Sequence, residues 1–206
     1  MAKIWGPMGW ITLHSIAASY PENPSFQLRQ VTSGFLDKFA ETITCRFCKD
    51  HFTAMLLTYR RNHPEFLDSR RDFFLFTVRA HNTVNKRLDK PIIQSVADSL
   101  QILKDATKLV SPSQFRLNYF SYLVRNWMHE LGSDGRIFSG VAKEMRKINE
   151  VWFSATSTEF SNEIEEGDTL EFIGESTFMY SPSHTRLVLA PIIVGFKRGK
   201  LSLKRN

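Results

Sequence analysis

The feature that most constrains this chain is an ordered set of three short motifs in its first half. The first motif contains Trp5, Trp10 and His14, the second is Cys45-Arg46-Phe47-Cys48, and the third starts at His81-Asn82. The second motif holds the only two cysteines among 206 residues. Because a pair this close in sequence closes too short a loop to add much stability, its redox or ligand chemistry is the better reason for its presence.

The composition predicts a folded domain that does not cross a membrane. The chain is 42% hydrophobic and 13% aromatic, with 17 Phe, which is ample for a packed core. No apolar run approaches the ~18 to 20 residues that span a bilayer. Two cysteines are also too few for a disulfide-stapled scaffold.

The charge distribution bears on nucleic-acid binding, and the N-terminal sequence bears on the cellular location. The net charge is +6, and much of the excess is in the last ten residues, at Lys197, Arg198, Lys200, Lys204 and Arg205. No RNA- or DNA-binding motif accompanies this tail, so we interpret it as solvated and expect no nucleic-acid partner. The first motif begins at Trp5 and leaves no room for a signal peptide, so we expect a cytoplasmic protein.

Apolar spacing predicts an all-α fold for the first 110 residues. Helices are expected over residues 10–20, 25–43, 45–61, 68–88 and 95–109, with Asp68 or Ser69 as the N-cap of the fourth. Short turns rich in Pro and Asn join them, and no strands alternate with them. The sequence therefore predicts a four-helix bundle with a short fifth helix.

Residues 111–206 form an extension whose role the sequence does not reveal. Ser111-Pro112-Ser113 is the expected linker, followed by helices over 114–131 and 136–153 and short strands over 169–173 and 186–196. The extension has no cysteine but is rich in aromatic residues. We expect a separate folded module that recruits a partner or builds a dimer and does no chemistry.

The C-x-x-C pair has one functional interpretation and two alternatives. At a helix N-terminus the first thiol lies over unpaired N–H groups and the positive end of the helix dipole, which lowers its pKa and favours disulfide exchange. The pair can also be inert and buried. A third possibility is a zinc site, in which Cys45, Cys48 and His51 supply three ligands and His81 the fourth.

The third motif supplies groups that suit a nucleotide cofactor. His81 and Asn85 are four residues apart and share a helix face, Asn82 lies beside it, and Arg87 and Lys90 follow. Buried amides and imidazoles need hydrogen-bond partners, which an adenine, a ribose and a pyrophosphate provide. A G-x-G-x-x-G loop is absent, which excludes a Rossmann-type cradle. The alternative for Trp10 and His14 is an ordinary place in the core.

Taken together, the motifs resemble one known family. The patterns W-G-x-x-x-W-x-x-x-H, C-x-x-C-x-x-H-F and H-N-x-V-N-x-x-L-x-K-P, in this order and over about residues 4 to 110, are similar to those of the Erv/ALR-type FAD-linked sulfhydryl oxidases. The low cysteine count and the unrelated extension look most like the members encoded by large DNA viruses, which implies the host cytoplasm or the virion.

The resemblance implies a thiol oxidase that forms disulfides in reduced protein substrates and passes the electrons through FAD to O₂, giving H₂O₂. It makes Cys48 the flavin-proximal sulfur and Cys45 the sulfur that meets substrate. It also implies a homodimer, for which Phe26, Phe35 and Phe39 are candidate interface residues. No bound metal is expected. The FAD contacts that it implies are Gly6, Trp10, His14, Tyr20, His51, His81, Asn82, Val84, Asn85, Arg87 and Lys90.

Two features of this chain differ from many relatives. Thr44 stands before the C-x-x-C where many relatives have Pro, and a separate shuttle pair of cysteines is absent. Cys45 must therefore meet its substrate directly, or another protein must supply the relay. The competing function is a non-catalytic helical scaffold whose C-x-x-C is structural or binds zinc.

Overall fold

The computed structural model describes residues 2–130, 134–154, 170, 172 and 173, and these residues form helices and connections without a strand. The mainly α fold predicted from the sequence is thus confirmed. The helices are α1 (Ala2–Ala18), α2 (Phe26–Glu41), α3 (Arg46–Asn62), α4 (Arg70–Arg87), α5 (Val96–Ala106), α6 (Pro112–Glu130) and α7 (Asp134–Ile148), followed by the π-helical turn η1 (Asn149–Phe153).

Side-chain caps fix where most of the bundle helices begin. The Ser25, Ser69 and Ser95 hydroxyls each accept a hydrogen bond from the backbone N–H three residues later, at the start of α2, α4 and α5. Such caps satisfy N–H groups that have no partner within the helix. Of the two candidates for the α4 cap, the structure selects Ser69.

Helix α1 begins eight residues earlier than the sequence analysis predicts, because Gly6, Pro7 and Gly9 do not interrupt it. Gly9 is buried where other helices come close. A Cβ atom built on Gly9 would lie 3.1 Å from the Tyr119 hydroxyl oxygen and 3.2 Å from Phe39 Cζ. The absence of a side chain is therefore what lets α2 and α6 approach α1 at this point.

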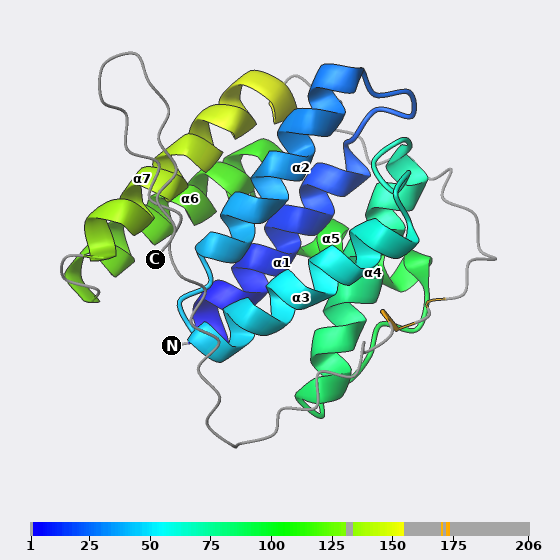
Figure 1. Ribbon diagram of the computed structural model, residues 1–206, viewed down its shortest axis with the longest axis horizontal. Helices are drawn as coiled ribbons and strands as arrows, with labels where there is room; N and C mark the ends of the chain where they lie inside the picture. The colour runs from blue at the N-terminus through cyan, green and yellow to red at the C-terminus, as the bar shows by residue number, and fades with distance from the viewer. Residues whose placement is uncertain (1, 131–133, 155–169, 171, 174–206) are drawn as a thin grey trace, which may run out of the picture. The chain divides into compact units, whose positions relative to one another are not determined.

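Helix α1 lies inside the helix assembly and is covered from several sides. It packs against α4, α5 and α6, while α2 packs against α3 and α7 (Figure 1). Its residues from Thr12 to Ala18 are all buried. The helix that carries Trp10 and His14 is consequently held by the rest of the bundle.

The extension contributes helices that pack against the bundle. Helices α6 and α7 lie side by side on the α1–α2 side, away from α4 (Figure 1). The described residues all fall within a single compact unit, residues 1–176. Helices α6 and α7 and the turn η1 therefore belong to the same compact unit as the bundle helices. As a division of function, the boundary between residues 110 and 111 stays a prediction.

The expected linker Ser111-Pro112-Ser113 is instead the start of α6. The backbone N–H of Gln114 donates to Ser111 Oγ at 3.2 Å, and that of Phe115 donates to the Ser111 carbonyl oxygen at 2.9 Å. Proline is favoured at the first position of a helix because its missing N–H would have no helical partner there. Ser-Pro is thus a start signal here and not a linker.

Aromatic contacts join the extension to α2. Phe35 meets Phe153 edge to face, with ring centroids 5.3 Å apart, and also packs against Phe120. Phe39 packs against Tyr119. Phe35 and Phe39 are buried in this way within one chain, and only Phe26, 66% exposed, stays available from the three expected dimer residues.

The predicted strands lie largely outside the described residues. The strand over 186–196 is wholly outside them, and of the strand over 169–173 the three described residues are not in a strand. The backbone N–H of Ile173 donates to Thr83 Oγ1 at 3.1 Å, and Lys86 Nζ lies 4.3 Å from the centre of the Phe172 ring. This part of the extension thus lies against α4.

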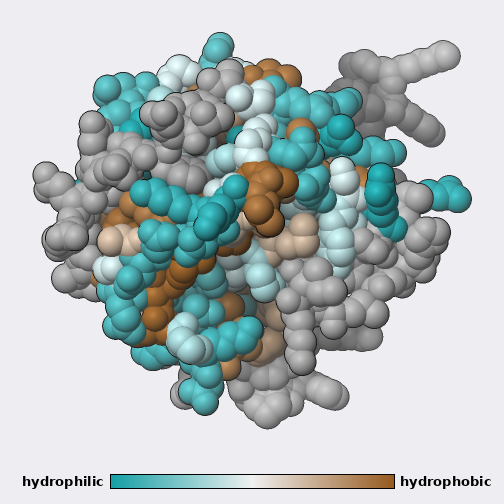
Figure 2. Space-filling view, turned by 180° about the vertical axis from the view of Figure 1, so that it is seen from behind, coloured by the Kyte–Doolittle hydropathy of each residue, from teal (hydrophilic) through white to brown (hydrophobic). Residues whose placement is uncertain are grey.

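Within the part of the chain that the structure describes, no helix is long and apolar enough to span a bilayer. The face seen from behind carries hydrophobic residues in patches among hydrophilic ones (Figure 2).

Candidate functional site

The two cysteines lie at the N-terminus of α3 and form a disulfide. Their Cα atoms are 5.2 Å apart. Cys45 is the N-cap residue, and its sulfur accepts a hydrogen bond from the backbone N–H of Cys48 at 3.3 Å. The helix predicted over residues 45–61 is confirmed, with Cys45 as its N-cap and Arg46 as its first residue. When the disulfide is reduced, the same N–H groups and the helix dipole favour a thiolate at Cys45.

Cys48 faces the interior more clearly than its position at a helix end suggests. It is half-buried and packs against the hydrophobic core, as Trp10 does. Phe52, one turn further along α3, is buried and lies 6.1 Å from Trp10 between ring centroids. The cysteine helix and the first motif therefore meet at the same part of the core.

Three aromatic side chains from the first and third motifs form a cluster. The rings of Trp10 and His81 are stacked, with centroids 4.4 Å apart and planes within 8°. His14 Nε2 lies 3.1 Å from His81 Nδ1, and His14 Nδ1 lies 2.9 Å from the Thr77 hydroxyl oxygen. Helices α1 and α4 together thus hold a flat indole–imidazole pair beside a buried second imidazole.

Burial keeps both imidazoles neutral. Desolvation holds the pKa of His14 well below its ordinary value, and the neighbouring His81 lowers it further. The pKa of His81 is lowered to about 4 by burial and, secondarily, by the charge of Lys90. Both rings are therefore uncharged at neutral pH and can accept as well as donate a hydrogen bond.

Asn82 has a structural role in this arrangement. Its amide nitrogen donates to the Ile93 carbonyl oxygen at 2.9 Å, and its amide oxygen accepts from the Ile93 N–H at 2.8 Å. The side chain is buried. It thus binds the segment after α4 in the way a neighbouring strand would, and both of its polar atoms have partners without a cofactor.

The end of α4 places the basic part of the third motif. Asp89 has φ of 51°, in the left-handed region. The N–H of Asp89 donates to the Lys86 carbonyl oxygen at 3.2 Å, and that of Lys90 donates to the Asn85 carbonyl oxygen at 2.9 Å. This is the Schellman pattern of hydrogen bonds at a helix C-terminus. It leaves the Lys90 side chain exposed next to the half-buried Val84 and Asn85.

The sequence matches known proteins over this same region. Residues 7–105 match the model of the Erv1 / Alr family. Over 98 residues the chain is 35% identical to the putative FAD-linked sulfhydryl oxidase 347L of Invertebrate iridescent virus 6, covering 46% of this chain and 88% of that protein. The chain belongs to the Erv1/Alr family.

Two further proteins and one solved structure are similar to the same region of this chain. The putative FAD-linked sulfhydryl oxidase 096R of Invertebrate iridescent virus 3 is 40% identical over 89 residues, which are 43% of this chain and 59% of that protein. The mitochondrial FAD-linked sulfhydryl oxidase ERV1 of Saccharomyces cerevisiae is 37% identical over 86 residues, 42% of this chain and 43% of that protein. The crystal structure of the yeast Erv1 core aligns with a TM-score of 0.42 at 29% identity, covering 52% of this chain and 82% of that chain.

Among the Erv1/Alr residues expected to contact FAD, several lie outside the Trp10–His14–His81 cluster. Tyr20 comes ten residues after Trp10, just beyond the end of α1 at Ala18. Its buried hydroxyl donates to the Leu67 carbonyl oxygen at 3.2 Å, and burial raises its pKa to about 12. The Arg87 guanidinium lies 4.6 Å from the centre of the ring of Phe47, the residue directly before Cys48 in the sequence. Gly6 lies one turn before Trp10, and His51 is half-buried on α3.

Sequence reasoning missed Thr77, whose hydroxyl contacts His14. Thr77 stands four residues before His81, so the two share a face of α4, and this spacing was the available signal. Ile93 was also missed, because the pairing of a side-chain amide with backbone across a turn leaves no periodic pattern.

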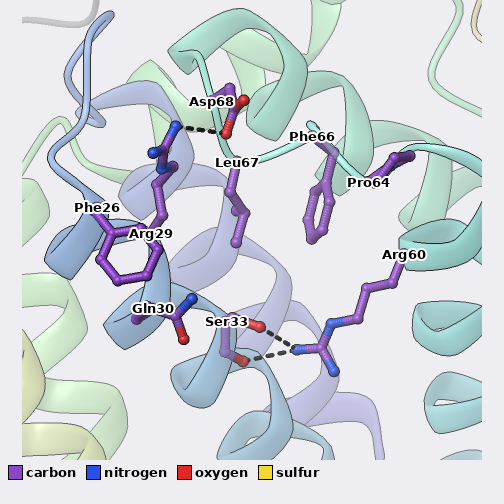
Figure 3. A pocket seen from close by; sticks show the side chains of 9 residues that line it. All are labelled: Phe26, Arg29, Gln30, Ser33, Arg60, Pro64, Phe66, Leu67 and Asp68. Carbon is purple, nitrogen blue, oxygen red and sulfur yellow. Dashed lines mark hydrogen bonds and ion pairs between the residues drawn. The ribbon is translucent and has the colours of Figure 1, made fainter.

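The described residues also contain a pocket of about 400 Å³ that is separate from the Erv1/Alr motifs. It is lined by Phe26, Arg29, Gln30, Ser33, Arg60, Pro64, Phe66, Leu67 and Asp68 (Figure 3). Arg60 lies 15 residues after Cys45, about 22 Å along α3. Arg29 is paired with Asp68 at 2.9 Å and Arg60 with Asp37 at 2.6 Å, so the pocket carries little net charge.

The zinc interpretation of the cysteine pair requires a group of metal ligands. Within the residues that the structure describes, no three or more His, Cys, Asp or Glu side chains are grouped to hold a metal ion. The two sulfurs are joined to each other in the structure.

Proposed function

We propose that this chain is an FAD-linked sulfhydryl oxidase that forms disulfides in reduced protein substrates. The observation that carries the proposal is the position of Cys48, which packs against the hydrophobic core one helical turn before Phe52, a neighbour of Trp10, while Cys45 caps the helix. Family membership and the names of the viral and yeast relatives support it. They favour it over the non-catalytic scaffold.

The residues present fit a flat, polar cofactor. Trp10 and His81 offer a flat aromatic surface, and His81 presents a neutral ring that can hydrogen-bond. Lys90 is exposed at the end of the same helix and can pair with phosphate. We propose that Trp10, His81, Val84, Asn85 and Lys90 hold FAD, with Gly6, His51 and Arg87 at its edges, and that the buried His14 acts through its hydrogen bond to His81. Asn82 and Tyr20 act indirectly, through their hydrogen bonds to the backbone of Ile93 and Leu67.

The chain's own chemistry is thiol–disulfide exchange. A substrate thiolate attacks Cys45 Sγ, which forms a mixed disulfide and releases Cys48 as a thiolate. A second substrate thiolate attacks the substrate sulfur of that mixed disulfide, so the substrate leaves oxidised and Cys45 leaves as a thiolate. Two electrons have then passed from the substrate to the cysteine pair. FAD, when bound, would supply the acceptor for these electrons, with O₂ as the final oxidant and H₂O₂ as the product.

Homodimerisation and location remain proposals beside this activity. Because Phe35 and Phe39 are buried by the chain's own α6 and η1, a homodimer would need another surface, such as the one around the exposed Phe26. The host cytoplasm or the virion stays the expected location. Sedimentation of the purified chain and imaging in infected cells test the two proposals.

Two cysteine variants test the proposed function. The purified protein is expected to be yellow and to release FAD on denaturation, and to consume O₂ with dithiothreitol. Cys48→Ser should abolish flavin reduction. Cys45→Ser should leave a thiolate facing the flavin and abolish turnover. A colourless protein that contains zinc, or full peroxide production by either variant, overturns the proposal.

A further inference from the structure

The Thr77 hydroxyl lies between two partners whose roles can be assigned. Thr77 Oγ1 is 2.7 Å from the Phe74 carbonyl oxygen and 2.9 Å from His14 Nδ1. All three groups are buried. Two oxygen atoms at 2.7 Å require a hydrogen between them, and a carbonyl has none to give. The hydroxyl hydrogen therefore goes to Phe74, and Oγ1 accepts a hydrogen bond from His14.

The hydrogen-bond direction at Thr77 determines which ring nitrogen carries the hydrogen in His14, and this in turn determines it in His81. His14 carries its hydrogen on Nδ1, and as a neutral ring it has a lone pair on Nε2. That lone pair faces His81 Nδ1 at 3.1 Å, so His81 donates from Nδ1. His81 is neutral as well, which leaves its Nε2 as an acceptor. The stacked Trp10 fixes the plane of the His81 ring and hence the direction of this lone pair.

We propose that Thr77 is a positioning residue that sets the tautomers of His14 and His81 and thereby presents His81 Nε2 to the cofactor as a hydrogen-bond acceptor. The identity of the cofactor rests on the proposed function, whereas the tautomers belong to the protein alone. The ligand atom at His81 Nε2 is then an N–H or O–H donor, such as an adenine amino group, a sugar hydroxyl or the flavin imide. A phosphate oxygen does not fit there, because it would face a lone pair.

The tautomers can be measured without the cofactor. Long-range ¹H–¹⁵N correlation spectra of the cofactor-free full chain distinguish protonated from unprotonated ring nitrogens, and His14→Gln and His81→Gln assign the signals. The expected result is a hydrogen on Nδ1 and a bare Nε2 for both residues at neutral pH. A hydrogen on Nε2 of either ring overturns the proposal.

Substitutions at Thr77 separate positioning from packing. Thr77→Val keeps the shape but removes the acceptor for His14, so both rings should change to mixed tautomers, and FAD should bind about tenfold more weakly in a flavin fluorescence titration. Thr77→Ser should keep the wild-type tautomers and affinity. Thr107→Val is the control, since the Thr107 hydroxyl donates to the Leu103 carbonyl oxygen at 2.8 Å far from either histidine in sequence.

The variants and the wild-type chain test different parts of the proposal. Unchanged tautomers in Thr77→Val, or an equal effect of Thr107→Val, overturn the role of Thr77. If the wild-type chain binds no FAD, the proposed function fails, while the spectra of the cofactor-free protein still confirm or reject the tautomer assignment.

Discussion

Arg116 of α6 donates from Nη1 to the Ser15 hydroxyl 3.3 Å away, and Ser15 directly follows His14 in α1. The same buried guanidinium donates from Nε to Asn149 Oδ1 at 2.7 Å and from Nη2 to the Phe153 carbonyl oxygen at 2.9 Å. Burial lowers the pKa of Arg116 to about 10, which leaves it charged at neutral pH. A cation of the extension thus ties α6 and η1 to the helix that carries the candidate site.

This relationship predicts that the first 110 residues do not suffice for a stable oxidase. A chain that ends at Val110 leaves the buried Phe35 and Phe39 without their partners from the extension. Exposing two such side chains costs about 3 to 6 kcal/mol, a large part of the stability of a typical domain. We expect this truncation to aggregate or to melt at a much lower temperature, measured by gel filtration and circular dichroism.

A chain that ends at Ser176 is the matched control, because it keeps the whole compact unit. It should bind FAD and oxidise dithiothreitol like the full chain. A monodisperse chain of residues 1–110 with bound FAD would show that the extension is dispensable for the site.

Two glycine substitutions should have opposite effects on stability. Gly9→Ala puts a methyl group 3.1 Å from the Tyr119 hydroxyl and 3.2 Å from Phe39, so these two buried rings must shift by a few tenths of an ångström, at a cost of about 1 to 3 kcal/mol. Gly34, in the interior of α2, has nothing within 4 Å of the position that a Cβ atom would occupy. Gly34→Ala should therefore stabilise the protein by up to about 1 kcal/mol through helix propensity. Urea denaturation measures both, and a stabilising Gly9→Ala would contradict the close approach.

Stability should fall as the solution becomes acidic. The folded-state pKa of His81 is about 4, against 6.5 for an unperturbed histidine. Below pH 6.5 the unfolded chain binds a proton that folded His81 does not accept until about pH 4, so the folded state loses stability across this interval. The loss from His81 alone is about 3 kcal/mol, and the lowered pKa of His14 adds to it.

Urea denaturation of the cofactor-free protein across this pH interval tests whether the free energy of unfolding falls as the pH is lowered. His81→Gln should flatten the pH dependence, and His14→Gln should do so as well. Stability that is constant or increases between pH 6.5 and 4 would show that the imidazoles are not held neutral.

Much of the fold could be predicted because its signals are local. Ser69 stands directly before a helical pattern, and the C-x-x-C lies where a helix begins, so caps and periodicity were enough to place both helix starts. Other local signals are compatible with more than one structure. Ser111-Pro112 suits a linker as well as a helix start, and only the packing of α6 against α1 decides between them.

The candidate site was predictable in its residue types and not in their partners. The motifs indicated Trp10, His14 and His81, and the structure brings these three together. Asn82 carried the same motif signal, yet its amide is used by Ile93. Thr77 carried no motif signal, although it contacts His14. The four-residue spacing of Thr77 and His81 shows that they share a face of α4, but which side chain of α1 they meet depends on how the two helices pack.

The last prediction concerns Phe47, which stands between the two cysteines. Its side chain is 61% exposed, and Arg87 of α4 lies over its ring at 4.6 Å. A cation over an aromatic face is attracted to it, and this contact holds the ring in place beside the disulfide. Aromatic residues and arginine are enriched in protein–protein interfaces relative to the rest of the surface. We therefore predict that Phe47 contacts protein substrates as they approach Cys45.

Phe47→Ala should lower kcat/KM on reduced lysozyme relative to kcat/KM on dithiothreitol, because the small thiol has no surface to place on the ring. The expected fall in this ratio is about tenfold, the size of a contact worth about 1.4 kcal/mol. Leu57→Ala is the control, since Leu57 is another apolar residue of α3, is 58% exposed, and lies three turns from the cysteines. O₂ consumption with each substrate measures the ratio. A proportional loss on both substrates would mean that Phe47 supports the disulfide itself and does not recognise the substrate, and an equal change in Leu57→Ala would mean that general surface hydrophobicity accounts for the effect.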